Sequence, residues 1–149
     1  MVFKSQVSVE YMTMVALSLA ALTVVWLYVN TSNDAVKQDL RISFARQAVV
    51  RLADAAKIVS IQGSPAKIMV DVTIPEGVLQ ARPSSPGECN ESEIFLQVAG
   101  IQGKATDVFA PVPINVSGNF SLSAIAPGVK RFSVEAITIN GLPCVKISG

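Results

Sequence analysis

Hydrophobic and polar positions follow three different patterns along the chain. Residues 12–29 contain no charged side chain, and an apolar run of this length is a candidate transmembrane helix. Further along, apolar residues recur every three or four positions, which predicts an amphipathic helix with one buried face. The residues of this predicted stripe are Val36, Leu40, Phe44, Ala48, Leu52, Ala55 and Val59. From Ala66 onwards the spacing changes to two, the period of a half-buried β-strand.

The two apolar stretches are predicted to form one long helix that ends at Gly63-Ser64-Pro65. Glycine favours the position after a helix C-terminus, and proline cannot continue a helix. Residues 30–34, Asn-Thr-Ser-Asn-Asp, lie between the stretches and are weak helix formers. Two alternatives stay open here. One is a kink or a melted turn, and the other is a continuous helix with a polar collar at the membrane boundary.

The second half of the chain is predicted to be a small β domain. The expected elements are a strand over 67–74, a loop over 75–92, a second strand over 94–98, a third over 105–114 and a short fourth over 119–123. Pro111 and Pro113 place the third strand at a sheet edge, because proline cannot donate to a central ladder. The predicted fold class is α+β, with the long helix packed on an antiparallel sheet.

The clearest local unit is a hairpin over residues 131–147. Asn140-Gly141 at its centre is the strongest two-residue hairpin signal, because both positions tolerate a positive φ. This turn sets a register in which Val134 faces Ile147, Ala136 faces Val145, and Glu135 faces Lys146 as a cross-strand ion pair. Near the turn both faces become apolar, with Ile137, Ile139 and Cys144 on the Glu135 side. We expect this end to be covered, either by the loop around Cys89 or by a subunit contact.

Composition excludes several classes of function. The chain has 149 residues, a net charge of +1 and no histidine, and neither half has the basic excess of a nucleic-acid binder. No Gly-rich phosphate loop, Ser/His/Asp set or metal-ligand cluster occurs. We therefore expect no catalytic residue, no cofactor and no bound metal.

The two cysteines, Cys89 and Cys144, are far apart in sequence and form no CxxC pair. We predict one disulfide between them, because an even pair in an exported chain is usually bonded. The alternative is two buried free thiols. Closing a loop of this size stabilises a fold by roughly 4 kcal/mol in the chain-entropy model.

The N-terminus combines a short leader, a motif and the apolar run. Residues 1–5 carry one positive charge, Lys4, and the apolar run follows the candidate cut instead of preceding it, unlike a secretory signal. Gln6, Ser8, Glu10 and Tyr11 give the pattern QxSxEY. Residues 1 to about 30 thereby resemble the archaeal type IV pilins that carry a class III signal peptide.

This resemblance implies a processing and assembly route. A prepilin peptidase would cut between Ser5 and Gln6, which makes residues 1–5 the leader, 6–63 the long helix and 64–149 the globular head. The pilus assembly machinery would then move the subunit from the membrane into a homopolymeric filament at the cell surface. The implied fold is type IV pilin-like, and the implied role is adhesion.

Glu10 would be the fifth residue after cleavage, where the family keeps a glutamate. An ionised carboxylate in a bilayer costs about 2.5 to 3.5 kcal/mol on insertion scales, so it favours a cationic partner. The new N-terminal amine of a neighbouring subunit would supply that cation. The alternative is a Glu10 that stays hydrated at the membrane surface without a partner.

Asparagine sequons are more frequent than chance predicts. Four N-x-[ST] matches occur, at Asn30, Asn90, Asn115 and Asn119, against about 0.85 expected from composition. Asn30 lies within or beside the helix. We therefore predict glycosylation at Asn90, Asn115 and Asn119, on the outer face of the head.

Two functions from different classes are compatible with these features. The first is a structural pilin, major or minor, that polymerises through its N-terminal helix. The second is a single-pass anchored extracellular β domain that binds a ligand or partner and never polymerises. The QxSxEY motif favours the first, because a plain anchor requires neither the motif nor an early glutamate.

Overall fold

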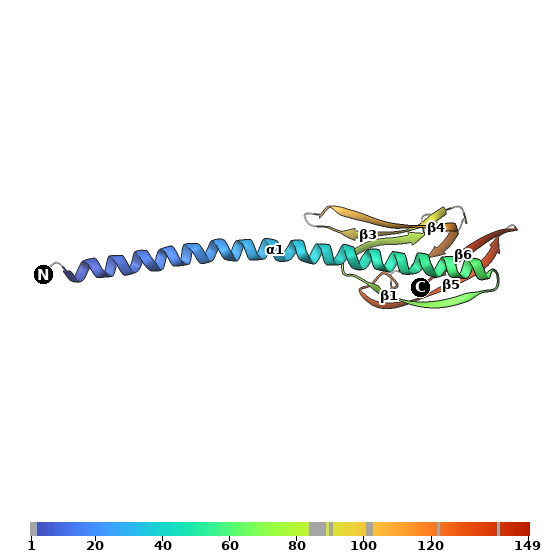
Figure 1. The fold of residues 1–149 in the computed structure, drawn as a ribbon, viewed down its shortest axis with the longest axis horizontal. Coiled ribbons are helices and arrows are strands. Elements are labelled where there is room, and N and C mark those ends of the chain that lie inside the picture. Colours follow the sequence, from blue (N-terminus) through green and yellow to red (C-terminus); the bar gives the residue numbers. More distant parts are fainter. Residues whose placement is uncertain (1–2, 84–88, 90, 101–102, 122, 140) are drawn as a thin grey trace. The chain divides into compact units, whose positions relative to one another are not determined.

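The computed structural model describes the chain except for residues 1–2, 84–88, 90, 101–102, 122 and 140. It is an α+β fold with one long helix followed by strands that form a single sheet (Figure 1). The elements are α1 (Phe3–Gln62), β1 (Lys67–Ile74), β2 (Val78–Pro83), β3 (Glu91–Ala99), β4 (Ala105–Asn119), β5 (Gly128–Ile139) and β6 (Leu142–Ser148).

The chain divides into two compact units, Met1–Lys37 and Gln38–Gly149. The second unit, called the head below, contains the last 25 residues of α1 (38–62) together with all six strands. The head therefore has a helix as part of its own core. The first unit consists of the apolar half of α1, the residues before it, and residues 30–37 of the same helix.

Helix α1 is continuous through residues 30–34, so these weak helix formers do not melt a turn of it. The Thr31 hydroxyl donates to the carbonyl oxygens of Leu27 and Tyr28, at 3.1 and 2.9 Å. This hydroxyl is thus satisfied inside the helix instead of competing with it. The helix ends at Gln62, as predicted. Gly63 has φ 73° and its N–H donates to the Val59 carbonyl at 3.0 Å, which satisfies one of the last carbonyls.

The sheet has the strand order β1-β5-β6-β4-β3-β2 and is mixed. Four neighbouring pairs are antiparallel, as predicted, but β4 and β6 run parallel, with Val116 opposite Val145 and Ser117 opposite Lys146. This parallel pair connects two antiparallel sub-sheets, β1-β5-β6 and β4-β3-β2. It joins segments that are distant in sequence, so local patterning does not reveal it.

The sheet is strongly curled. Strands β1 and β2 are the two edges, yet only residues 75–77 connect them. Three connecting residues span at most about 14 Å, whereas six flat strands would place the edges about 24 Å apart. The sheet therefore bends around residues 38–62 of α1, which lie along its concave side (Figure 1).

The core of the head forms where α1 meets this concave side. Helix residues in it are mostly small: Ala45, Ala48, Val49, Leu52, Ala53, Ala55, Ala56 and Val59. The predicted stripe is correct from Ala48 onwards but wrong at Val36, Leu40 and Phe44, which are 55%, 51% and 44% exposed. The helical period was predicted correctly, but the residues of the first half of the stripe do not lie on the buried face.

Three strand predictions are wrong. The short fourth strand expected over 119–123 is not present, because β4 ends at Asn119 and residues 120, 121 and 123 lie outside any strand. The predicted loop over 75–92 contains strand β2, and β4 is an internal strand that runs to Asn119 instead of an edge strand that ends near 114. The prolines fit because pairing with β3 passes from Glu93–Pro111 to Glu91–Val116, so residues 112–115 of β4 lie opposite the single residue Ser92. Pro113 therefore lies in a bulge where no ladder hydrogen bond is required.

The hairpin prediction is confirmed. In β5–β6, Glu135 lies opposite Lys146, Ala136 opposite Val145 and Val134 opposite Ile147. Gly141 has φ 81°, while Asn140 lies outside the described residues. One detail differs: the recorded ion pair of Glu135 is with Lys67 of β1, at 3.6 Å, and not with Lys146.

A second cross-strand ion pair, between Asp71 and Arg131, supports a pH prediction. Nε and Nη2 of Arg131 donate to Oδ1 and Oδ2 of Asp71, at 2.7 and 3.1 Å. This hydrogen bonding holds the pKa of Asp71 below its usual value of 3.8. A carboxyl group whose pKa is lowered by folding stabilises the folded state at pH values above its unfolded pKa. This stabilisation is lost as the pH falls through the folded pKa.

We expect Asp71→Asn to lower the Tm of the head slightly at neutral pH and not at all well below pH 3.8. The effect is small because both side chains are exposed, and it should shrink further in high salt. Thermal unfolding followed across pH at two salt concentrations measures it. A Tm difference that does not change with pH would contradict this account.

Candidate assembly and modification sites

The apolar half of α1 is exposed around its whole circumference. Its most apolar 18-residue window has a mean hydropathy of 2.0, and none of that window is buried. Large exposed side chains here include Met12, Met14, Leu17, Leu22, Val24, Trp26, Leu27 and Tyr28. By length and composition this helix can cross a membrane: residues 9–29 span about 31 Å, close to the thickness of a bilayer core.

Polar side chains within this half are satisfied by the helix itself. The hydroxyls of Thr13, Ser18 and Thr23 donate to the carbonyls of Glu10, Met14 and Leu19, at 2.8 to 2.9 Å. Such hydroxyls can enter an apolar environment without leaving a donor unpaired. The segment therefore behaves as an apolar surface despite its polar residues.

The motif residues lie at the beginning of this helix. Helix α1 begins at Phe3, so the candidate cut between Ser5 and Gln6 falls within helical backbone. Glu10 and Tyr11 are exposed, whereas the side chains of Gln6 and Ser8 lie outside the described residues. The structure thus places Glu10 at the start of the apolar half, with its side chain exposed.

The head portion of α1 also carries exposed apolar residues, two of which, Leu40 and Phe44, were predicted to lie in the core. At 3.6 residues per turn, the exposed residues Leu40, Phe44, Val50, Ile58 and Ile61 fall within an arc of about 120° that also holds Gln47, Arg51 and Asp54, largely on the side away from the buried face. We call these five residues the outer helix face. In the sequence, the outer helix face is visible as a set of large apolar residues at helical positions different from those of the alanine-rich buried residues.

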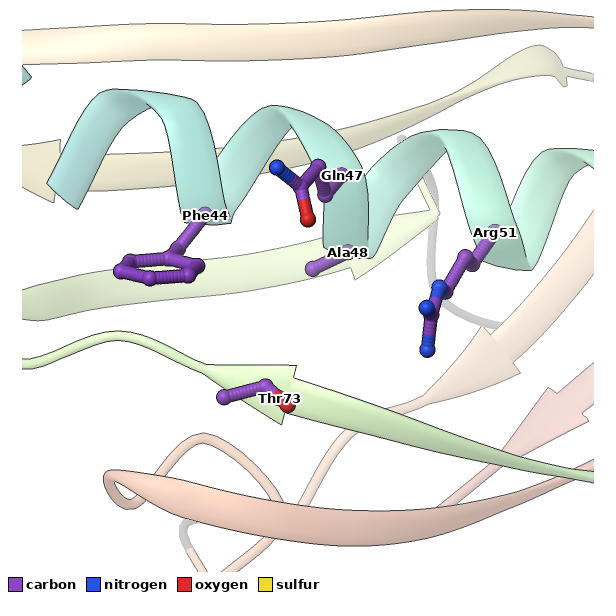
Figure 2. A pocket seen from close by; sticks show the side chains of 5 residues that line it. All are labelled: Phe44, Gln47, Ala48, Arg51 and Thr73. Atoms are coloured by element: carbon purple, nitrogen blue, oxygen red, sulfur yellow. The ribbon is translucent and has the colours of Figure 1, made fainter. Parts of the chain in front are cut away.

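A small hollow borders this face (Figure 2). Figure 2 shows Phe44, Gln47 and Arg51 of α1 turned toward Thr73 of β1. The hollow measures about 60 Å³, far below the 300 to 1,000 Å³ of ordinary small-molecule sites. It can take solvent or one side chain, and it does not indicate a cofactor.

Cys89 and Cys144 form the predicted disulfide, with Cα atoms 6.0 Å apart. Cys144 is opposite Ile137 in the hairpin and is only 1% exposed, although it lies on the side of the sheet away from α1. Cys89, in the β2–β3 connection, is bonded over this point. The bond brings Cys89 to Cys144, while Ile137 and, nearer the turn, Ile139 are half-buried.

The sequons lie in different environments. Asn115 is half-buried in β4, and Ser117 of the same sequon is 6% exposed. Asn119 is the last residue of β4, and Ser121 of its sequon is exposed. Asn90 and the side chain of Asn119 lie outside the described residues, and Asn30 is within α1.

Among the described residues, no group of three or more His, Cys, Asp or Glu side chains is placed to hold a metal ion. Comparison with models of protein families, with curated proteins and with solved structures finds no match to this chain. The functional conclusion therefore depends on the physical features of the molecule and on the N-terminal motif.

Proposed function

We propose that this chain is a structural subunit of an archaeal type IV pilus that acts in adhesion. The observation that carries the proposal is the wholly exposed apolar half of α1, which directly follows the QxSxEY motif and continues into the helix of the head. In this proposal a prepilin peptidase cuts before Gln6, and the assembly machinery transfers the subunit from the membrane to the filament. The protein is a building unit and not an enzyme.

Apolar burial is the driving force for assembly. Soluble monomers rarely expose an apolar patch larger than about 600 Å², so residues 9–29 require cover from lipid or from protein. A helix that is apolar all round needs neighbours on every side. Contacts between different surfaces of identical copies generate open helical polymers, which is the geometry of a filament.

The outer helix face supports polymerisation over simple anchoring. Residues 34–57 contain eight charged side chains, so this part of α1 is unsuited to the lipid interior. Lipid therefore cannot cover Leu40, Phe44 and Ile58, whereas helices of other copies can. A plain membrane anchor gives these exposed residues no partner.

Replacing Glu10 by valine tests the proposal. We expect at least a tenfold loss of surface filaments with an unchanged amount of protein in the membrane, because a buried carboxylate pairs with a cation of a neighbouring copy. The matched control is Asp39→Val, which removes an exposed acid from the head portion of α1. Filaments at the wild-type level in Glu10→Val would contradict the pairing role.

Sequencing the N-terminus of purified surface filaments separates the two functional classes. A chain that begins at Gln6 in filaments is the expected result. Recovery from membranes alone, with Met1 intact, would support the single-pass anchor that binds a partner without polymerising.

We also propose that the head carries N-linked glycans at Asn90, Asn115 and Asn119. In a filament with the helices inside, the side of the sheet away from α1 faces the surroundings. Mass spectrometry of the native protein measures occupancy at each site, and three unmodified asparagines would contradict this part of the proposal.

A further inference from the structure

The sequon Asn115-Val116-Ser117 is placed where the folded head can carry a glycan but cannot receive one. We propose that Asn115 is glycosylated before the head folds, so that transfer to this site precedes closure of the sheet and of the disulfide. The inference rests on the glycosylation proposed above and is independent of filament assembly.

The first step concerns access to the hydroxyl of Ser117. An N-x-[ST] sequon is defined by two side chains, so the transferase must contact the serine as well as the asparagine. Ser117 is only 6% exposed, and Val116 between the two is completely buried. In the folded head, the transferase can therefore reach the Asn115 side chain at most, and not the Ser117 hydroxyl.

The second step concerns the backbone. Val116 is paired with Glu91 of β3 on one side and with Val145 of β6 on the other, and Ser117 is paired with Lys146. The sequon cannot leave the sheet unless β4 separates from β6, at the centre of the strand order. An opening of this extent is close to global unfolding and is correspondingly rare.

The third step shows that the finished fold tolerates the modification. Val112 and Val116 are buried and Ile114 packs against the core, so strand alternation turns Asn115 away from α1. Asn115 is half-buried and lies in the bulge that residues 112–115 of β4 form opposite β3. A glycan attached earlier can therefore project from the bulge without breaking the ladder.

The disulfide adds a second barrier to late transfer. Val116 is opposite Val145, so Asn115 on β4 and Cys144 on β6 both lie one position before this parallel pair. Cys144 also faces away from α1, and Cys89 is bonded to it there. The bond thus ties a residue just before β3 to β6, the two strands that flank Val116, so β4 is harder to release once the bond has formed.

The transfer itself uses a lipid-linked oligosaccharide pyrophosphate as donor. The Asn115 amide nitrogen forms a bond to the anomeric carbon of the first sugar, while the bond from that carbon to the pyrophosphate oxygen breaks. The lipid pyrophosphate leaves as the anion, and the amide nitrogen gives one proton to a base of the transferase. No redox partner is required.

The sequon of Asn119 is a control within the same chain. It lies at the end of β4, and its Ser121 is exposed, with Oγ donating to the Gly149 carbonyl at 3.0 Å. Asn119 is paired with Ser148 at the end of β6 and Phe120 packs on Phe132, but the serine of this sequon, unlike Ser117, is exposed. Transfer to this sequon should therefore depend much less on whether the head is folded.

The experiment uses the full chain from a host without the glycan donor. Folded oxidised chain in detergent micelles and unfolded reduced chain are each incubated with an oligosaccharyltransferase and its lipid-linked oligosaccharide. Mass spectrometry then follows the occupancy of Asn115 and of Asn119. We expect modification of Asn115 to be at least tenfold slower in the folded chain, with a much smaller difference at Asn119.

A variant makes the structural cause testable. A side-chain carbon at Gly118, where φ is 151°, would overlap the Ile147 carbonyl oxygen of β6, so Gly118→Ala should open the β4–β6 pair and restore transfer to Asn115 without denaturant. Gly128→Ala is the matched control, since φ is 119° but nothing lies within 4 Å. Equal rates in folded and unfolded wild type would overturn the inference. So would an Asn115 that stays unmodified in the unfolded chain while Asn119 is modified.

Discussion

Replacing Leu52 by alanine is expected to lower the free energy of unfolding of the head by about 2–5 kcal/mol. Leu52 is 2% exposed and belongs to the core between α1 and the sheet. Its neighbours on the helix are largely alanines, whose short side chains cannot move into the space that the substitution leaves. The loss should therefore include a cavity contribution in addition to the lost apolar burial.

The matched control for this prediction is Leu40→Ala. Leu40 is the same residue type in the same helix but is 51% exposed, so the expected change is within about 0.5 kcal/mol. Urea unfolding of the full chain in detergent micelles, followed by circular dichroism, measures both variants. Similar losses for the two would mean that α1 is buried on both faces, contrary to the structure.

Features encoded by neighbouring residues were predictable from the sequence. The register of the β5–β6 hairpin follows from one Asn-Gly turn and strict alternation, and the structure has the same pairs. The end of α1 follows in the same way from Gly63 and Pro65. Each of these features involves a short segment, so few alternatives compete with it.

Features that depend on distant contacts were not predictable in this way. Periodicity in α1 identifies apolar positions but not which of them meet the sheet. Leu40 and Phe44 are large but exposed, whereas Ala45 and Ala53 are buried, because the buried face is set by the part of the helix that meets the sheet. The internal position of β4 was hidden because its bulge accommodates the prolines.

The candidate sites show the same division. The motif and the apolar half of α1 are visible in the sequence because they are contiguous. The burial of Ser117 is not, because it follows from the parallel pairing of β4 with β6, two strands that are separated along the chain by β5. A sequon count therefore treats Asn115 and Asn119 alike, and the sheet distinguishes them.

Removing the disulfide is expected to destabilise the head by about 4 kcal/mol, because the bond closes a loop of 55 residues. This loop contains β3, β4 and β5 in full. In the reduced unfolded chain, β6 has to find β4 without this restraint, so the conformational entropy lost on folding is larger. The variant Cys89→Ala with Cys144→Ala tests this by urea unfolding in detergent micelles.

Reduced wild-type chain is the appropriate control, because it lacks the bond but keeps both side chains. Cys144 is 1% exposed, so alanine there also removes buried volume and adds to the loss. The reduced wild type should therefore lie between the oxidised wild type and the double variant. If reduction leaves the free energy of unfolding unchanged, the sheet alone holds Cys89 and Cys144 close together and the bond adds no stability. In that case the strand pairing of β6 with β4 and β5 must supply the stability that the loop-closure argument assigns to the disulfide.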